Sequence, residues 1–238
     1  MSQLDHRQVI AIDGPGAAGK STVARLLADR TGAMLFDTGV LYRAVTLAAI
    51  RAGIAGGDAV SLAKLARRQR IDIQPASIDD GRQVNVLLDD KDVTWAIRTP
   101  EVDAQVSQVA AHPAVREALL EAQRSIADGV RVVMVGRDIG TVVIPQAGIK
   151  IYLDASASER ARRRLAELQG RGIDATLERV LVDLRARDAY DAGRETAPLA
   201  VATDAVVVDS DNRTIENIVS EIQQLAESTW QQAGVNGG

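Results

Sequence analysis

A glycine-rich segment follows directly on a short apolar run, Val9–Ile12, and leads into a helical pattern. The segment reads Asp13-Gly14-Pro15-Gly16-Ala17-Ala18-Gly19-Lys20-Ser21-Thr22. It satisfies the pattern G-x-x-x-x-G-K-[ST] between a strand and a helix, which is the context that this motif requires. Glycines let successive backbone N–H groups converge on phosphate oxygens at the positive end of the following helix. The segment therefore predicts a phosphate-binding loop in an α/β fold.

Within this loop, Lys20 and Ser21 carry the residue types that act on a nucleoside triphosphate. A lysine at this place reaches the β- and γ-phosphates, and the hydroxyl after it can ligate Mg²⁺. We therefore expect the loop to bind a nucleoside triphosphate with Mg²⁺. The expected contact residues are Gly14, Pro15, Gly16, Ala17, Ala18, Gly19, Lys20, Ser21 and Thr22.

The same glycines also match a dinucleotide-binding fingerprint. Gly14, Gly16 and Gly19 fit G-x-G-x-x-G, and Asp37 follows as a candidate ribose carboxylate. A dehydrogenase is therefore the alternative from another class. Lys20 and the following hydroxyls argue against it, because a site for a pyrophosphate alone needs neither the added charge nor a metal ligand. No Asn-Lys-x-Asp tetrapeptide is present, which weakens a GTPase interpretation.

Composition narrows the class further. The chain has 238 residues, a formal net charge of −4, 46% hydrophobic residues and no cysteine. Such a chain can bury a core but can form neither a disulfide scaffold nor a thiolate metal site. The acidic balance argues against a nucleic-acid or anionic-membrane partner. The polar first residues and the lack of any apolar run of about 20 residues lead us to expect a soluble, cytoplasmic protein.

Short apolar runs alternate with helical periodicity along the chain, which predicts βαβ units and a parallel sheet. Helical patterns lie around 20–30, 40–52, 59–69, 101–111, 114–128, 156–169, 175–190 and 214–228. The five expected core strands are Val9–Ile12, Met34–Phe36, Val132–Val135, Ile149–Leu153 and Ala205–Val208. Nearly all their residues are apolar, so we expect helices to cover both faces of this sheet.

One stretch departs from the alternation. Ile71–Gln74 and Val84–Leu88 are β-like, and Asp79-Asp80-Gly81 between them is a turn signal. We interpret them as a small antiparallel hairpin inside an inserted module. The expected organisation is a core over 1–37, an insertion over 38–129, and a second core segment over 130–238.

Arginines follow two of the expected core strands. Arg43 comes shortly after Asp37-Thr38-Gly39, and Arg137 and Asp138 follow Val132–Val135. Open α/β sheets bind ligands at the carboxyl ends of their strands. The two arginines could hold a second phosphate opposite the loop, although each taken alone could equally form a surface ion pair.

The segment from 156 to 194 contains nine arginines and no lysine. Arg160, Arg163 and Arg164 share one helical face, and so would Arg187, Asp191 and Arg194 if the helix continued past Ala192. One interpretation is a solvated helix pair bridged by acidic side chains. We favour an arginine-rich lid over about 156–197 that closes on polyphosphate.

Six segments together resemble the bacterial-type cytidylate kinase family, over about residues 9–209. They are the phosphate loop; Asp-Thr-Gly-Val-Leu-Tyr-Arg at 37–43; Ile-Arg-Thr-Pro-Glu-Val at 97–102; Val-Ser-Gln-Val-Ala-Ala-His-Pro-Ala-Val-Arg at 106–116; Gly-Arg-Asp-Ile-Gly-Thr-Val-Val at 136–143; and Arg-Asp-x-x-Asp-x-x-Arg with Ala-Pro-Leu at 187–199. Thr38 stands where many members have serine, and Ala189, Tyr190 and Ala192 fill lid positions that are often charged in relatives.

The resemblance implies a P-loop fold with a five-stranded parallel sheet, an inserted nucleoside-monophosphate-binding module and a lid. It also implies transfer of the γ-phosphoryl group of ATP to CMP or dCMP with Mg²⁺, in pyrimidine metabolism, by a monomeric enzyme. The implied catalytic residues are Lys20, Arg163, Arg164 and Arg194. The implied CMP-binding residues are Thr38, Tyr42, Arg43, Ser107, Arg116, Arg137, Asp138, Arg187 and Asp191.

The resemblance assigns parts of the acceptor to particular residues. Arg43 and Arg137 would hold its phosphate, Arg187 and Asp191 its ribose, and Ser107, Arg116 and Asp138 its cytosine. Neither His6 nor His112 is expected to be catalytic. The alternatives that remain are another P-loop kinase, such as one acting on UMP and CMP, and a nucleotide-binding module without turnover.

Overall fold

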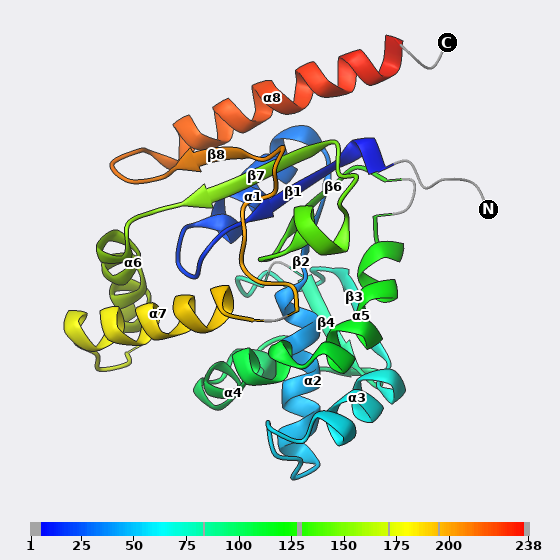
Figure 1. Ribbon diagram of the computed structural model, residues 1–238, viewed down its shortest axis with the longest axis vertical. Helices are drawn as coiled ribbons and strands as arrows, with labels where there is room; N and C mark the ends of the chain where they lie inside the picture. Colours follow the sequence, from blue (N-terminus) through cyan, green and yellow to red (C-terminus); the bar gives the residue numbers. More distant parts are fainter. Residues whose placement is uncertain (1–5, 83, 128–129, 171, 195, 236–238) are drawn as a thin grey trace. The chain divides into compact units, whose positions relative to one another are not determined.

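The computed structural model describes residues 6–82, 84–127, 130–170, 172–194 and 196–235 (Figure 1). The chain divides into two compact units. Unit 1 comprises Met1–Asp37 and Arg124–Gly238, and unit 2 comprises Thr38–Gln123.

Unit 1 contains a five-stranded sheet in the order β2-β6-β1-β7-β8. Every pairing in it is parallel. Its strands are β1 (Val9–Asp13), β2 (Met34–Asp37), β6 (Val132–Val135), β7 (Ile149–Asp154) and β8 (Val206–Asp209). All five strands lie where the apolar runs predicted them, so the predicted five-stranded parallel sheet is confirmed.

The central and edge strands of this sheet differ in burial. Val9–Ile12 of β1 are fully buried, because β6 and β7 pair with β1 on its two sides. At the edge, β8 exposes 40% of Val206 and 56% of Val207. Because successive strand residues point to opposite faces, the expectation that both faces of every strand are covered is wrong for β8, the edge strand.

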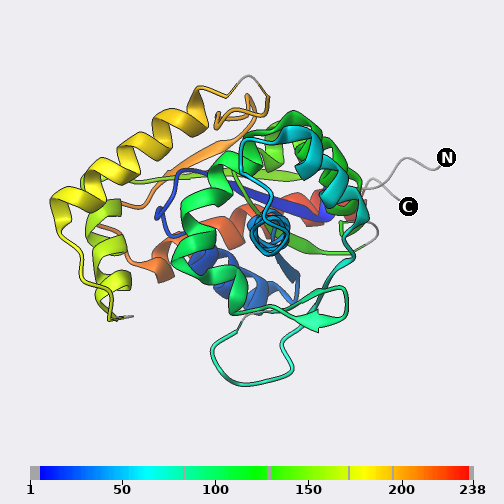
Figure 2. The ribbon, with the colours of Figure 1, turned by 90° about the horizontal axis from the view of Figure 1, so that it is seen from below.

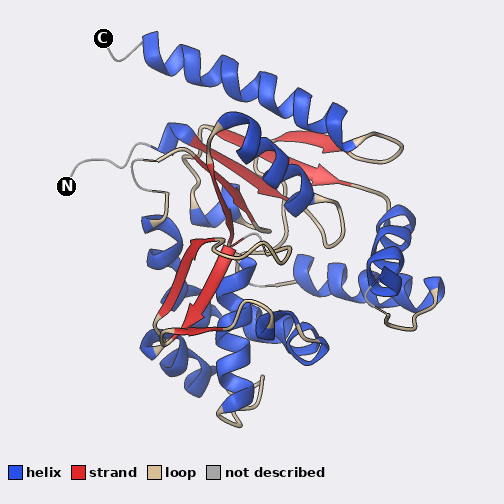
Figure 3. Ribbon diagram, turned by 180° about the vertical axis from the view of Figure 1, so that it is seen from behind, coloured by secondary structure: helices blue, strands red, loops and turns tan. Residues whose placement is uncertain are grey.

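Helices α1 (Lys20–Thr31) and α8 (Ile215–Val235) contact each other and pack on the sheet (Figure 3). Their apolar residues share one core cluster with the central strands, in which Leu27 and Ile222 lie with Ile10 and Val133. The remaining elements of unit 1 are a short 3₁₀ turn (His6–Gln8), one turn of π-helix (Ile139–Val143), α6 (Ala157–Gly170) and α7 (Leu177–Ala192).

Helices α6 and α7 are adjacent, and they form the arginine-rich segment (Figure 2). Buried Ala161, Val180 and Leu184 hold the pair together, and Ala17 of the glycine-rich loop packs against this cluster. The segment therefore lies directly against the loop. Arg171, one of its nine arginines, lies outside the described residues.

Unit 2 is built around α2 (Gly39–Arg51), which is seen end-on in Figure 2. From Leu41 to Ala49, every residue of this helix except Arg43 is buried, which shows that other elements surround it. The other elements of unit 2 are α3 (Ala59–Arg68), β3 (Ile71–Pro75), β4 (Val84–Leu88), β5 (Lys91–Asp92), η2 (Ala96–Arg98), α4 (Pro100–Ala111) and most of α5 (Pro113–Ser125).

The predicted hairpin of β3 and β4 is present and antiparallel, but a third strand, β5, extends it. The turn before β5 places Asp89 and Asp90 at φ 49° and 65°, both in the left-handed region. Sequence analysis missed β5 because its two residues, Lys91 and Asp92, are charged and exposed and show no apolar alternation. Within the described residues, no helix is both long enough and apolar enough to span a membrane.

Candidate active site

The glycine-rich loop leaves the end of β1 and ends where α1 begins, at Lys20. Gly14 has a φ of 146°, and a Cβ there would lie 2.1 Å from the carbonyl oxygen of Leu153. Gly19 has a φ of 95° and precedes the first helical residue. Glycine is required at both positions for conformation, and at Gly14 also for space. The loop thus runs from the centre of the sheet to the amino end of α1, where backbone N–H groups favour an anion.

The ammonium group of Lys20 faces the inside of this loop. Its Nζ donates hydrogen bonds to the carbonyl oxygens of Gly14, at 2.8 Å, and Pro15, at 2.7 Å. Burial, together with the positive charge of Arg137, lowers the pKa of Lys20 from 10.5 to about 7, and Asp37 and Asp13 oppose part of this shift. A lysine in such surroundings gains from a nearby phosphate, because the phosphate stabilises its charged form.

The Ser21 hydroxyl, on the first turn of α1, lies 3.4 Å from a carboxylate oxygen of Asp37 at the end of β2. Among the described residues, no cluster of three or more His, Asp or Glu side chains could hold a metal ion. One hydroxyl and one carboxylate suit Mg²⁺, which prefers oxygen ligands and keeps several waters beside one or two protein groups and substrate phosphates. The donor set therefore fits Mg²⁺ bound together with a nucleotide.

Two arginines of α6 bind the main chain of the loop. Arg160 donates to the carbonyl oxygen of Gly16 and Arg163 to that of Ala18, each at 3.3 Å. Arg163 also donates to Ser210, to its hydroxyl at 2.9 Å and its carbonyl oxygen at 2.8 Å. Sequence analysis predicted neither contact: it expected Arg163 to meet the transferring phosphoryl group and gave Arg160 no role of its own. The spacing of Arg160 on the Arg163 face was the signal that could have found it.

Several arginines of α6 and α7 pair with acidic neighbours on their own helix, and Arg163 does so as well, with Glu159 at 3.0 Å. Arg162 pairs with Glu159, Arg164 with Glu167 at 2.7 Å, and Arg179 with Asp183. These pairs agree with the solvated-face interpretation for these three arginines, and the lid that closes on polyphosphate stays a prediction. The structure joins Arg163 to the loop and Arg164 to Glu167, although both were predicted to act together.

Asp191, near the end of α7, is fully buried and interacts with three arginines. Arg137 and Arg194 form ion pairs with it, and Arg187 lies 3.9 Å from it. The helix ends at Ala192, so Arg194 does not extend the predicted helical face; instead the chain turns at Gly193 and still brings Arg194 to Asp191. Burial lowers the pKa of Arg137 well below its usual value, and repulsion from Arg187 and Arg194 adds to the effect.

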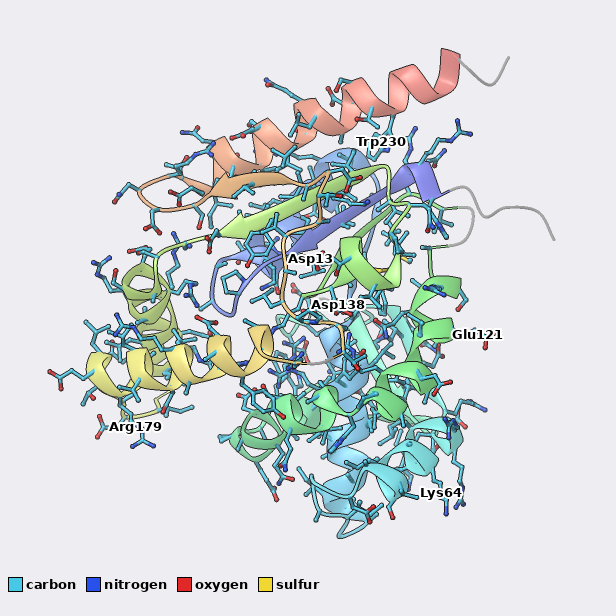
Figure 4. All side chains as sticks on the ribbon, viewed as in Figure 1. Asp13, Lys64, Glu121, Asp138, Arg179 and Trp230 are labelled. Atoms are coloured by element: carbon cyan, nitrogen blue, oxygen red, sulfur yellow. The ribbon has the colours of Figure 1, made fainter. Side chains whose placement is uncertain are left out.

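Asp138 follows Arg137 directly and is buried in the same unit. The next two backbone N–H groups, of Ile139 and Gly140, donate to the two carboxylate oxygens of Asp13, each at 2.8 Å. Figure 4 labels Asp13 and Asp138, which come from β1 and from the segment after β6. Burial raises the pKa of Asp13 to about 6, the two hydrogen bonds oppose this shift, and the charge of Asp138 adds to it. Sequence analysis assigned Asp13 no role.

In unit 2, Arg43 extends from α2 toward α4. Its guanidinium group lies 2.7 Å from the carboxylate of Asp103 and donates to the carbonyl oxygen of Ile97 at 3.1 Å. Thr38, directly before α2, is buried. The structure therefore holds Arg43 at one carboxylate within its own unit, and sequence analysis missed Asp103.

Tyr42 and Arg116 lie together in unit 2. The guanidinium group of Arg116 is 5.3 Å from the centre of the Tyr42 ring, and it donates to the carbonyl oxygen of Ala110 at 3.1 Å. Gln123 donates to the Tyr42 hydroxyl at 3.3 Å. Ser107 is half-buried on α4, the helix that precedes Arg116. Two predicted base-reading residues, Ser107 and Arg116, therefore lie in unit 2, and the third, Asp138, lies in unit 1.

Two further residues, His112 and Asp209, make hydrogen bonds to main-chain groups. His112 binds the main-chain carbonyl of Gly56 through Nε2 at 2.7 Å. The Asp209 carboxylate accepts from the backbone N–H of Asp211 at 2.8 Å, as a turn residue does.

A strand, a glycine-rich loop with an inward-facing lysine, a helix, and arginines bound to that loop define a P-loop nucleotide kinase. The family model described as Cytidylate kinase matches residues 10–228. The chain therefore belongs to the cytidylate kinase family. The resemblance found in the sequence is confirmed, and the dehydrogenase and GTPase alternatives are set aside.

Curated relatives agree with this membership. A cytidylate kinase of Herpetosiphon aurantiacus is 50% identical over 216 residues, which is 91% of this chain and 93% of the relative. Another, of Chloroflexus aggregans, is 52% identical over 207 residues, covering 87% of this chain and 88% of the relative. Among solved structures, an uncharacterized protein from Eubacterium ventriosum aligns over 92% of this chain and 98% of its own, with a TM-score of 0.50 and 12% identity, a similarity of fold alone.

Proposed function

We propose that this protein transfers the γ-phosphoryl group of ATP to CMP or dCMP, giving ADP and CDP or dCDP. Family membership makes it a nucleoside-monophosphate kinase with ATP as the phosphoryl donor. The observation that carries the proposal is that Lys20, Arg160 and Arg163 all bind carbonyl groups of one glycine-rich loop. The choice of CMP follows from the relatives, whose printed names are all cytidylate kinase.

The reaction joins two anionic groups. An oxygen of the acceptor phosphate attacks the γ-phosphorus of ATP, the bond to the β,γ-bridging oxygen breaks, and ADP leaves with that electron pair. The acceptor phosphate is already an anion at neutral pH, so no general base is needed. Catalysis then consists of alignment and neutralisation of charge.

Donor binding belongs to unit 1. The backbone of Gly14–Gly19 would hold the β- and γ-phosphates, and Lys20 would exchange its two carbonyl contacts for phosphate oxygens. Ser21 and Asp37 would hold Mg²⁺, which supplies positive charge to the β- and γ-phosphates when bound. Arg163, with Arg164 and Arg194 as further candidates, would meet the transferring phosphoryl group.

The proposed acceptor-binding residues are assigned within each unit by itself. Arg43 and Arg137 would bind the phosphate of CMP, and Arg187 and Asp191 the ribose hydroxyl groups. Cytosine presents an amino donor and two acceptors, so Asp138 or Ser107 would accept from the amino group and Arg116 would donate to the ring. Thr38 and Tyr42 would complete this site, and residues 38–129 would form the monophosphate-binding module.

The proposal also includes a cytoplasmic, monomeric enzyme. ATP and CMP are metabolites of the cell interior, which supports the location.

A coupled assay of ADP release with CMP, dCMP, UMP and AMP as acceptors tests the proposal. We expect CMP or dCMP to accelerate ADP release most. Faster turnover with UMP or AMP would point to another monophosphate kinase, and no acceleration by any acceptor would point to a binding module. Lys20→Ala should reduce turnover about 1,000-fold with an unchanged circular dichroism spectrum, because it removes a preorganised charge from the transition state.

A further inference from the structure

The last residue of β1, Asp13, is a buried acid that the reaction above does not use. Asp13 is 5% exposed and ends a strand whose other residues are apolar. Both of its carboxylate oxygens accept hydrogen bonds, from the backbone N–H groups of Ile139 and Gly140 at 2.8 Å each. Asp13 therefore bonds to the first two residues of the π-helical turn Ile139–Val143.

The segment bonded in this way carries two of the predicted acceptor-binding residues. Arg137 and Asp138 immediately precede Ile139, and the N–H of Gly136 donates to the carbonyl oxygen of Ile12 at 3.1 Å. Arg137 and Asp138 are thus bracketed by hydrogen bonds to two consecutive residues of β1. A Cβ at Gly16 would lie 3.9 Å from an Nη atom of Arg137, so this segment also adjoins the phosphate loop.

The turn is closely fitted at the Asp13 carboxylate. A Cβ at Gly140 would lie 3.4 Å from an oxygen of Asp13 and 3.1 Å from Cδ of Lys150. The main chain at Gly140 can approach the carboxylate because glycine has no side chain. A side chain at position 140 would therefore crowd the Asp13 carboxylate and Lys150.

The surroundings of Asp13 disfavour the negatively charged form of its side chain. Burial and the charge of Asp138 raise its pKa, while the two backbone hydrogen bonds and Lys20 lower it. Tyr152 on β7 is the register partner of Asp13. A carboxyl group with a raised pKa that accepts hydrogen bonds from two backbone N–H groups beside a phosphate loop is typical of a functional site.

We propose that Asp13 is a positioning residue of the acceptor site, because its carboxylate holds the turn that carries Arg137 and Asp138 against the strand from which the phosphate loop leaves. It acts through that turn and does not touch substrate. The inference rests on the proposed function, since it assumes that Arg137 and Asp138 bind the monophosphate.

The test substitutes asparagine for Asp13. Asparagine has nearly the same shape, but its amide oxygen can accept a hydrogen bond from only one of the two backbone N–H groups. Its NH₂ group is itself a donor and would face the other N–H. Losing a hydrogen bond to a charged group corresponds to about a 10- to 100-fold effect. We expect Asp13→Asn to raise the KM for CMP by about that factor, with the KM for ATP changed less than about 3-fold.

A matched control and a second variant separate positioning from folding. Asp154→Asn makes the same chemical change at the end of neighbouring β7, where the carboxylate accepts from the N–H of Ala155, and it should leave both KM values near those of the wild type. Gly140→Ala disturbs the same contact from the other side and should reproduce the CMP-selective defect.

The outcomes separate the two claims. A wild-type protein that transfers phosphate to no monophosphate would overturn the proposed function, whatever the variants do. An active wild type with an Asp13→Asn variant that keeps the KM for CMP, or loses affinity for ATP and CMP equally, would overturn only the positioning role. Binding of ATP and CMP, measured separately by calorimetry, decides the matter for a variant that turns over too slowly for kinetics.

Discussion

The guanidinium group of Arg43 and the carboxylate of Asp103 lie 2.7 Å apart, within unit 2. In unit 1, Arg137 forms an ion pair with Asp191 in the same way. Each arginine predicted to bind the acceptor phosphate is thus paired with a carboxylate of its own unit. Under the proposed function, an incoming phosphate would have to share or displace that carboxylate, and the carboxylates would then help to set the affinity for the acceptor.

The Arg43–Asp103 pair gives a first prediction. Asp103→Ala should lower the KM for CMP by about 2- to 5-fold with little change in kcat. The substitution removes a carboxylate that repels the acceptor phosphate, and a partly exposed ion pair of this kind contributes only about 0–1 kcal/mol to stability. The hydrogen bond from Arg43 to Ile97 keeps the arginine oriented. Steady-state kinetics at low and moderate salt check this. A higher KM for CMP would mean that Asp103 orients Arg43 instead.

Arg137 gives a second prediction. Arg137→Ala should raise the KM for CMP about 10- to 100-fold, because a charged hydrogen bond to phosphate is lost. The fold should persist, since Arg187 and Arg194 still interact with Asp191 and one source of cation repulsion is removed. Arg185→Ala, an exposed position on α7, is the control and should leave CMP kinetics unchanged. Equal KM values for the two variants would contradict the assignment.

The pKa of Lys20 predicts that ATP binding takes up a proton. Burial lowers this pKa to about 7, so at pH 8 the group is about nine-tenths neutral, and a bound polyphosphate restores its charge. Calorimetry of ATP binding at pH 8 in HEPES and in Tris, whose ionisation enthalpies differ, should reveal uptake of up to about 0.9 proton. Lys20→Arg is the control, because arginine stays charged. The same uptake in that variant would assign the proton to another group.

Asp13 predicts a pH dependence of stability. Its pKa is about 6 in the folded protein and 3.8 when unperturbed. Between these values the folded form keeps a proton that the unfolded chain releases, so stability falls as pH rises through this window. The contribution is at most about 3 kcal/mol. Asp13→Asn should remove it, so the stability of the variant relative to the wild type should increase from pH 4 to pH 6. Urea unfolding at several pH values measures this, and a constant difference would contradict it.

Much of the fold could be predicted from local patterns. The apolar runs marked all five core strands, and the motif at residues 14–22 marked the loop between β1 and α1. The hairpin of β3 and β4 was likewise visible as two β-like runs around a turn signal. These signals are local, because a strand or a glycine turn is written in consecutive residues.

The parts that sequence analysis missed depend on partners far along the chain. Sequence analysis assigns Asp13 no role, because only the fold brings it to Gly140. The sequence does not distinguish Arg160 from the other eight arginines of its segment, and only the packing of α6 brings it to the carbonyl oxygen of Gly16. The exposure of Val206 and Val207 follows from the place of β8 at the edge, which its composition does not show.

For this protein, the sequence alone determined the order of its elements, the phosphate loop and the family, because each of these is encoded by residue types at short and regular spacing. Only the tertiary structure decided which arginine binds the loop, which carboxylate pairs with Arg43 or Arg137, and where Asp13 makes its hydrogen bonds. Such pairings join residues of distant segments, and burial decides which of several chemically equal side chains forms each one.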